Sequence, residues 1–175
     1  MENLIFVGGI HGVGKGTICR NVCSKNELNH LTASDVLKWE EISTPQNKLV
    51  KDFTFTQDRL IENLKKIIIP NKKYILDGHY CLLDKEGKPE RINQLTFELI
   101  NPFALVLVTG NVGEIKDRLD KRDNVSYDIN LLEDFQNIEL EYAQFLSKFL
   151  NKQLLVINKD TEHILNDYIR NESFT

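Results

Sequence analysis

One stretch decides how the rest of the chain is interpreted: Gly9-Ile10-His11-Gly12-Val13-Gly14-Lys15-Gly16-Thr17. It follows a short apolar run at residues 4–7, which predicts a buried strand, and it leads into residues 15–25, whose apolar positions have helical spacing. A glycine-rich turn lets many backbone N–H groups converge on one point, as phosphate oxygens require. The following helix adds its dipole and its free amides. The stretch therefore predicts a phosphate-binding loop.

Within this loop, Lys15 is expected to face solvent and to bring positive charge to the β- and γ-phosphates of ATP, the predicted phosphoryl donor. The residues expected to hold those phosphates are Gly12, Val13, Gly14, Lys15, Gly16 and Thr17. The pattern G-x-x-x-x-G-K-[ST] is met only up to the lysine, because Gly16 occupies the hydroxyl position and Thr17 follows it. This shift weakens the expectation that a loop hydroxyl binds Mg²⁺ directly. A bare glycine-rich turn with an exposed lysine is the alternative.

Apolar runs that predict strands alternate with stretches of helical periodicity along the whole chain. The predicted strands are residues 4–7, 31–33, 74–76, 103–108 and 154–157. This alternation predicts an α/β fold, with a parallel sheet and helices on both faces. Because no repeat, linker or low-complexity segment interrupts the pattern, residues 1–175 are expected to form one domain. Ligands of such sheets bind beyond the carboxyl ends of the strands.

Asp77 ends one of these predicted strands, so its carboxylate is expected to lie beside the loop. Oxygen ligands suit Mg²⁺, and Asp77 is the predicted metal-binding residue. An ordinary Asp-Gly turn is the alternative interpretation. A second candidate feature is the pair Arg118 and Arg122, four residues apart near the end of a predicted helix. The two arginines either clamp phosphates as part of a closing lid or form surface ion pairs such as Glu114–Arg118.

Composition bears on nucleic-acid binding, on membrane insertion and on the role of the cysteines. The net charge of −4 argues against an extended nucleic-acid surface. The longest clearly apolar run, residues 103–108, is too short to span a bilayer, and a cytoplasmic protein is expected. Cys19 and Cys23 lie four residues apart on a predicted helix, with His11 and His30 nearby in sequence. These four residues could form a zinc site. We favour the alternative, in which the two cysteines belong to the buried face of the helix.

Four stretches, taken together, resemble the archaeal-type adenylate kinases and their eukaryotic nuclear relatives. They are GGIHGVGKGT (8–17), ILDGHYC (75–81), NPFALVLV (101–108) and RLDKRD (118–123) before a long helix. The resemblance covers nearly the whole chain. It implies a P-loop kinase fold with a five-stranded parallel sheet in the order 2-3-1-4-5. A substrate-binding region at about residues 34–70 and a small lid at about residues 118–130 are further implications.

The resemblance also implies site residues for transfer of phosphoryl from Mg·ATP to AMP or a related monophosphate. His79 is expected near the donor and acceptor phosphates, and Arg118 and Arg122 in the lid. Those expected toward the acceptor are Ser34, Asp35 and Arg59. This chain departs from the family pattern in two places. The lid carries only two arginines, and few residues of 39–55 match, although Trp39, Phe53 and Phe55 could stack a base or belong to the core.

Three functions remain open on the sequence. The first is an adenylate kinase-like nucleoside monophosphate kinase, which needs positioning and charge rather than a strong base. The second is a kinase of another small molecule, such as a nucleoside or an antibiotic hydroxyl, in which Asp35 accepts the hydroxyl proton. The third is an ATPase that switches a partner contact during assembly of a larger particle. His11 either touches phosphate or occupies a tolerant position in the loop.

Overall fold

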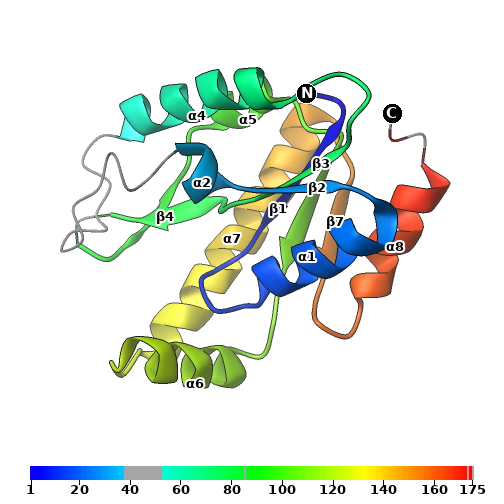
Figure 1. Cartoon of the computed structure of the whole chain (residues 1–175). Helices are drawn as coiled ribbons and strands as arrows, with labels where there is room; N and C mark the ends of the chain where they lie inside the picture. Colours follow the sequence, from blue (N-terminus) through cyan, green and yellow to red (C-terminus); the bar gives the residue numbers. More distant parts are fainter. Residues whose placement is uncertain (38–52, 85, 173, 175) are drawn as a thin grey trace.

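The computed structural model describes residues 1–37, 53–84, 86–172 and 174, and its centre is a parallel sheet (Figure 1). The sheet consists of β1 (Leu4–Gly8), β2 (Asn29–Thr32), β3 (Tyr74–Asp77), β6 (Ala104–Val108) and β7 (Leu154–Ile157). Their order is β2-β3-β1-β6-β7, and every neighbouring pair is parallel. Counting only these five strands along the chain gives the expected order 2-3-1-4-5, so the predicted fold class is confirmed.

The apolar runs become the centre of the sheet. All five residues of β1 and all five of β6 are buried, as expected of strands covered on both faces. Val7 pairs in register with Asp77 of β3 and with Val106 of β6. The carboxyl ends of β1 and β3 therefore lie side by side, which brings the loop after β1 next to Asp77.

Helices cover both faces of this sheet. Their bounds are α1 (Lys15–Asn26), α2 (Ala33–Leu37), α4 (Phe53–Ile67), α5 (Gln94–Ile100), α6 (Val112–Asp123), α7 (Ile129–Leu150) and α8 (Glu162–Asn171). On one face α1 contacts β1, β2 and β3 and packs against α8. The long helix α7 covers β6 and β7 from the other face and contacts α5 and α6. Among the described residues, no helix has both the length and the apolar composition needed to cross a membrane.

Residues 81–100 hold two elements that the periodicity did not predict. A short antiparallel hairpin joins β4 (Cys81–Leu83) to β5 (Pro89–Arg91), and α5 follows it, capped by the side chain of Asn93. Strands of three residues are too short to produce an alternating pattern, so periodicity does not reveal them. The hairpin directly follows the Asp77-Gly78-His79 turn and continues it away from the sheet.

Helix α7 buries one face in the core and leaves part of its aromatic surface exposed. Phe145 and Phe149 are each 44% exposed. The side chains that α7 buries are Leu132, Phe135, Glu139, Tyr142, Ala143 and Leu146. These positions follow the spacing of three and four residues that is typical of one helix face, and they include an acid. Trp39 lies outside the described residues, and the side chains of Phe53 and Phe55 are likewise not described.

Candidate active site

The loop after β1 turns sharply at two glycines before α1 begins. Gly12 has φ 77° and Gly14 has φ 103°, in the left-handed region that glycine tolerates. A Cβ atom at Gly12 would also lie only 2.8 Å from Leu119 of α6. Thr17 and Ile18 each donate a backbone hydrogen bond to the Gly14 carbonyl, which starts the helix. The loop therefore leads directly into the N-terminus of α1, as an anion site requires.

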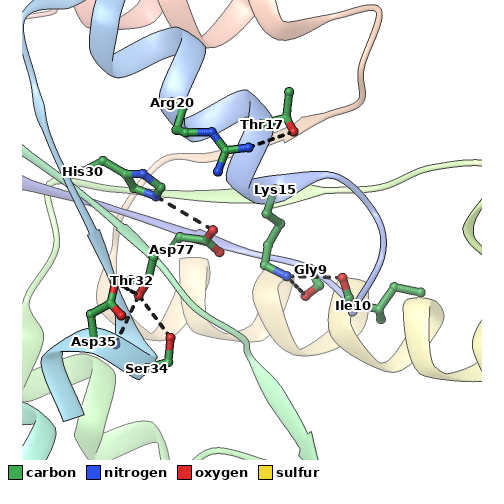
Figure 2. A network of polar contacts seen from close by, with 10 residues as sticks. All are labelled: Gly9, Ile10, Lys15, Thr17, Arg20, His30, Thr32, Ser34, Asp35 and Asp77. Atoms are coloured by element: carbon green, nitrogen blue, oxygen red, sulfur yellow. Dashed lines mark hydrogen bonds and ion pairs between the residues drawn. The ribbon is translucent and has the colours of Figure 1, made fainter. Parts of the chain in front are cut away.

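Lys15, the first residue of α1, folds back over this loop (Figure 2). Its Nζ donates hydrogen bonds to the carbonyl oxygens of Gly9 (2.7 Å) and Ile10 (3.2 Å). The side chain is only 7% exposed, so the expectation of a solvent-facing lysine is wrong. The loop carbonyls accept hydrogen bonds from the ammonium group and so replace the water that would otherwise solvate it. Burial lowers the pKa of Lys15, while the nearby Asp77 and Glu139 carboxylates act in the opposite direction.

Asp77, the last residue of β3, lies against the start of α1, close to the position of Gly16. A Cβ atom at Gly16 would be 3.5 Å from Asp77 Oδ2 and 3.4 Å from Nη1 of Arg20. The ring of His30 lies beside the carboxylate, with Nε2 3.9 Å from Oδ2 (Figure 2). Burial raises the pKa of Asp77, and the charge of Lys15 opposes this shift. The absence of a side chain at Gly16 leaves room in front of the carboxylate.

A hard cation fits beside Asp77 better than a soft one. Mg²⁺ takes carboxylate oxygen, and Asp77 presents one beside the phosphate loop. Cys19, His30 and Asp77 offer ligand atoms within 4.8 Å of one another, whereas Cys23 and His11 are not part of this cluster. Burial raises the pKa of the Cys19 thiol far above its ordinary value, so it stays protonated and is a poor ligand. Both Cys19 and Cys23 are buried in α1, as the favoured interpretation of the cysteines predicted.

His79 lies between the loop and α7. Its ring centroid is 4.1 Å from that of His11, at 45° between the ring planes. Its Nδ1 is 3.9 Å from Oε1 of Glu139. Burial first, and then the charge of Lys15, lowers the pKa of His79 well below its ordinary value, so its imidazole is neutral at physiological pH.

A cavity of about 1120 Å³ connects these groups. The polar and charged side chains that line it include those of His11, Lys15, Thr17, Arg20, Thr32, Ser34, Thr56, Gln57, Asp77, His79, Thr96, Arg118 and Arg122. Its apolar wall comes from β1, α2, α4, β4, α5 and α6. Among the described residues, Asp35 and Arg59 do not line this cavity, although both were expected toward the acceptor. The volume is large enough for two nucleotide-sized molecules, or for one with its solvent.

The two arginines of α6 differ in their surroundings. Arg118 donates from Nε to the Glu114 carbonyl oxygen (3.1 Å), and its Nη1 is 3.7 Å from a Cβ atom built at Gly14. It therefore reaches the loop, while the Glu114 carboxylate pairs with Lys159. Arg122 donates to both carboxylate oxygens of Asp123, at 2.7 and 2.6 Å. Both side chains line the cavity at the end of α6, and residues 124–128 link this end to α7.

On the side of the cavity formed by α2, the Thr32 hydroxyl makes hydrogen bonds that hold the start of the helix. Thr32 donates from Oγ1 to the Asp35 carboxylate (2.6 Å) and lies 3.1 Å from the hydroxyl of Ser34 (Figure 2). Across the cavity, Thr96 donates to the side-chain carbonyl of Gln57 at 2.7 Å. Ser34 lines the cavity, so it is available to a ligand.

Sequence reasoning did not assign a role in phosphate binding to three residues near this site, Arg20, Gln57 and Glu139, and it considered His30 only for a zinc site. Arg20 lies five residues after Lys15 and donates to the Thr17 hydroxyl at 3.3 Å. The signal for Glu139 was an acid four residues after Phe135 and three before Tyr142, both on the buried face of α7. Nothing in the local pattern distinguishes His30 or Gln57 from ordinary strand and helix residues.

The fold and the loop together define a P-loop phosphotransferase: a parallel sheet of this order, with a phosphate loop between β1 and α1 and a lysine at the start of the helix. The chain belongs to the family whose model is described as an AAA domain, which matches residues 8–136.

Its relatives narrow this class to adenylate kinase-like proteins. An adenylate kinase isoenzyme 6 homolog of Dictyostelium discoideum is 22% identical over 174 residues, covering 95% of this chain and 91% of that protein. The adenylate kinase of Mycoplasma mobile is 25% identical over 203 residues, covering 99% and 88%. Among solved structures, a shikimate kinase from Acinetobacter baumannii matches with a TM-score of 0.62 at 13% identity, covering 95% and 90%; this likeness shows the fold alone. The resemblance to adenylate kinases is confirmed.

Proposed function

We propose that this protein is a nucleoside monophosphate kinase that transfers the γ-phosphoryl group of Mg·ATP to AMP or a related monophosphate. The observation that carries the proposal is the charge of the cavity lining. Four cationic side chains, those of Lys15, Arg20, Arg118 and Arg122, face one carboxylate, Asp77, among the described residues. Such a lining suits two anionic phosphate substrates. The near full-length similarity to adenylate kinases supports the same acceptor class.

The residues of the cavity have distinct roles in this proposal. The loop amides and Lys15 bind the phosphates of ATP, and Arg118 and Arg122 hold charge that spreads over both substrates during transfer. Asp77 would hold Mg²⁺, which neutralises phosphate charge when bound. Ser34 and Gln57 face the acceptor side. Neutral His79 donates or accepts a hydrogen bond beside the phosphates without adding charge.

A hydroxyl acceptor fits this lining less well. Such a kinase needs a carboxylate that can take the hydroxyl proton. Asp35, the sequence-based candidate, accepts a hydrogen bond from Thr32 and lies off the cavity wall. Asp77 is the remaining carboxylate on the described lining, and we assign it to the metal. An ATPase switch for particle assembly and a cytoplasmic location both stay predictions.

The test is a panel of acceptors given to the purified protein with Mg·ATP. The panel contains AMP, CMP, UMP and GMP, together with nucleosides and shikimate as hydroxyl acceptors, and formation of ADP and of the phosphorylated acceptor is measured. We expect AMP or another monophosphate to be phosphorylated and the hydroxyl acceptors to be left unchanged. Phosphorylation of a hydroxyl acceptor alone would contradict the proposal, as would ATP hydrolysis that no acceptor alters.

A further inference from the structure

Glu139 is a carboxylate with no contact to solvent, and it lies behind the turn that follows β3. It is 0% exposed, and Lys15 is the other charged side chain that is buried in the described part of the chain. Its Oε1 accepts hydrogen bonds from the backbone N–H groups of Tyr80 (3.1 Å) and Cys81 (3.0 Å). Burying a carboxylate costs several kcal/mol unless its charge is compensated. A helix such as α7 would ordinarily carry an apolar residue at this position.

The two backbone bonds do not account for the charge. A glutamine amide oxygen could accept both of them at much lower desolvation cost. The groups that surround the Glu139 carboxylate therefore indicate why a charged residue stands at this position. His79 Nδ1 lies 3.9 Å from Glu139 Oε1, and Lys15 is close enough for the carboxylate to oppose the lowering of its pKa. In the described residues, His79 Nδ1 and Glu139 Oε2 are both buried without a hydrogen-bond partner. The two unpartnered atoms therefore belong to side chains that face each other at a separation longer than a direct hydrogen bond.

His79 connects this buried pair to the site. Its ring packs against that of His11 in the phosphate loop and lines the cavity, while Glu139 does not reach the cavity wall. The backbone of Gly9, at the start of the loop, is close enough to influence both side chains. A carboxylate that lies beside one imidazole nitrogen favours the tautomer that carries its proton there, and this sets what the other nitrogen offers.

We propose that Glu139 is a positioning residue for phosphoryl transfer, which fixes the turn after β3 and orients the His79 imidazole toward the phosphate loop. This inference rests on the proposed function, because it requires the transferred phosphate to lie in the cavity beside His79. Glu139 itself touches no substrate. It acts through His79 and through the charge that it presents to Lys15.

The first test compares Glu139→Gln with Glu141→Gln. The control lies on the same helix, but its side chain is 69% exposed and pairs with Arg91 at 3.5 Å. The amide introduced by Glu139→Gln keeps an oxygen for Tyr80 and Cys81 and loses the charge. We expect kcat for AMP-dependent turnover to fall roughly 10- to 100-fold, as for other residues that orient a site side chain. KM for ATP should stay within roughly twofold, because the loop amides are untouched. The control should match the parent.

The second test needs no turnover. In ¹⁵N-histidine-labelled protein, the imidazole resonances of His79, assigned with a His79→Gln variant, should move in Glu139→Gln and stay in place in Glu141→Gln. An unmoved His79 resonance, an unchanged kcat, or a kcat loss that merely follows a lower melting temperature would each overturn the proposal. Should Glu139→Gln not fold, Glu139→Asp keeps the charge at shorter reach, and its partial kcat loss with a shifted His79 resonance would support the proposal; an unmoved resonance would overturn it. If the parent phosphorylates no monophosphate, the proposed function fails, while the resonance comparison still decides the role of Glu139.

Discussion

Buried charges concentrate where β1 and β3 end, and they depend on one another. Lys15 lies over the loop carbonyls, with Asp77 and Glu139 both close by, and each carboxylate favours the charged form of the lysine. A charge in such surroundings exerts a stronger field than one in water. Replacing Lys15 is therefore expected to affect phosphoryl transfer more than the stability of the fold.

Lys15→Met should abolish measurable phosphoryl transfer, a loss of at least roughly two to three orders of magnitude, because the ammonium group that stabilises the transferring phosphate is gone. The fold should persist, since methionine fills the same buried path. AMP-dependent ADP formation and the melting temperature are the measurements. Lys25→Met is the matched control on the same helix, because Lys25 is exposed and pairs with Glu162. Near-normal turnover in Lys15→Met would remove the loop lysine from the mechanism.

Asp77→Asn should lower turnover far more than it lowers ATP affinity. The carboxylate is assigned to Mg²⁺, whose charge matters most as negative charge shifts during transfer, whereas the loop amides still bind the phosphates. Activity is measured across a Mg²⁺ titration, and ATP affinity by direct binding. If parent and variant share the same rate and the same Mg²⁺ dependence, Asp77 is only a turn residue.

Glu139→Gln should become more stable than the parent as the pH rises. Burial raises the pKa of Glu139 from 4.5 to about 7. The folded state therefore holds this proton more tightly than the unfolded state does, so the contribution of Glu139 is full below about pH 4.5 and is lost as pH rises through about 7. Glutamine does not ionise and escapes this loss, which could reach on the order of 3 kcal/mol. Denaturant unfolding between about pH 5 and about pH 8 measures it; parallel stability curves would contradict the prediction.

At the scale of elements, α6 carries the positive charge that faces the loop. Its N-cap is Asn111, whose side chain accepts a hydrogen bond from the backbone N–H of Glu114. Near its other end are Arg118 beside the loop and Arg122 paired with Asp123. Tyr127 also donates to Asp123 at 2.6 Å, so the arginine is held at the junction with α7. A small movement of this junction would change how both arginines meet a phosphate.

Arg118→Ala and Arg122→Lys should each lower AMP-dependent turnover, by roughly two orders of magnitude for a lost contact to a desolvated phosphate, and leave ATP affinity nearly unchanged. The lysine variant should be damaging because a single ammonium group does not replace the planar fork that binds two oxygens. Lys121→Ala, exposed on the same helix and off the cavity lining, is the control. Full turnover in both arginine variants would exclude α6 from the reaction.

The elements show where sequence patterns suffice and where they fail. Long apolar strands such as β6 could be predicted because burial on both faces requires continuous apolar residues. The hairpin of β4 and β5 could not be predicted, because strands of three residues are too short to show an alternating pattern of apolar residues. On α7, Phe145 and Phe149 stack on each other in a row with Tyr142 while remaining half exposed, so aromatic residues alone do not mark the buried face. The cap of α7 is Asp128, whose side chain accepts a hydrogen bond from the backbone N–H of Asn130.

At the scale of the whole molecule, sheet topology assembles the site. Pairing of Val7 with Asp77 brings the loop, the metal-binding candidate and His79 to one edge, although about seventy residues separate them in the chain. This much followed from strand order and could be predicted. The placement of Asp35 and Arg59 off the cavity could not, because it depends on how α2 and α4 pack. Glu139 was missed because an acid within a helix is usually exposed.

The central claim is that the phosphoryl group moves from ATP to a nucleoside monophosphate. The most direct measurement follows the γ-phosphate label of [γ-³²P]ATP with AMP, Mg²⁺ and purified protein, with Lys15→Met as the inactive control. We predict that the label appears in the β-phosphate of newly formed ADP, and that no such ADP forms without AMP. Label released only as inorganic phosphate, at a rate that AMP does not change, would contradict the account.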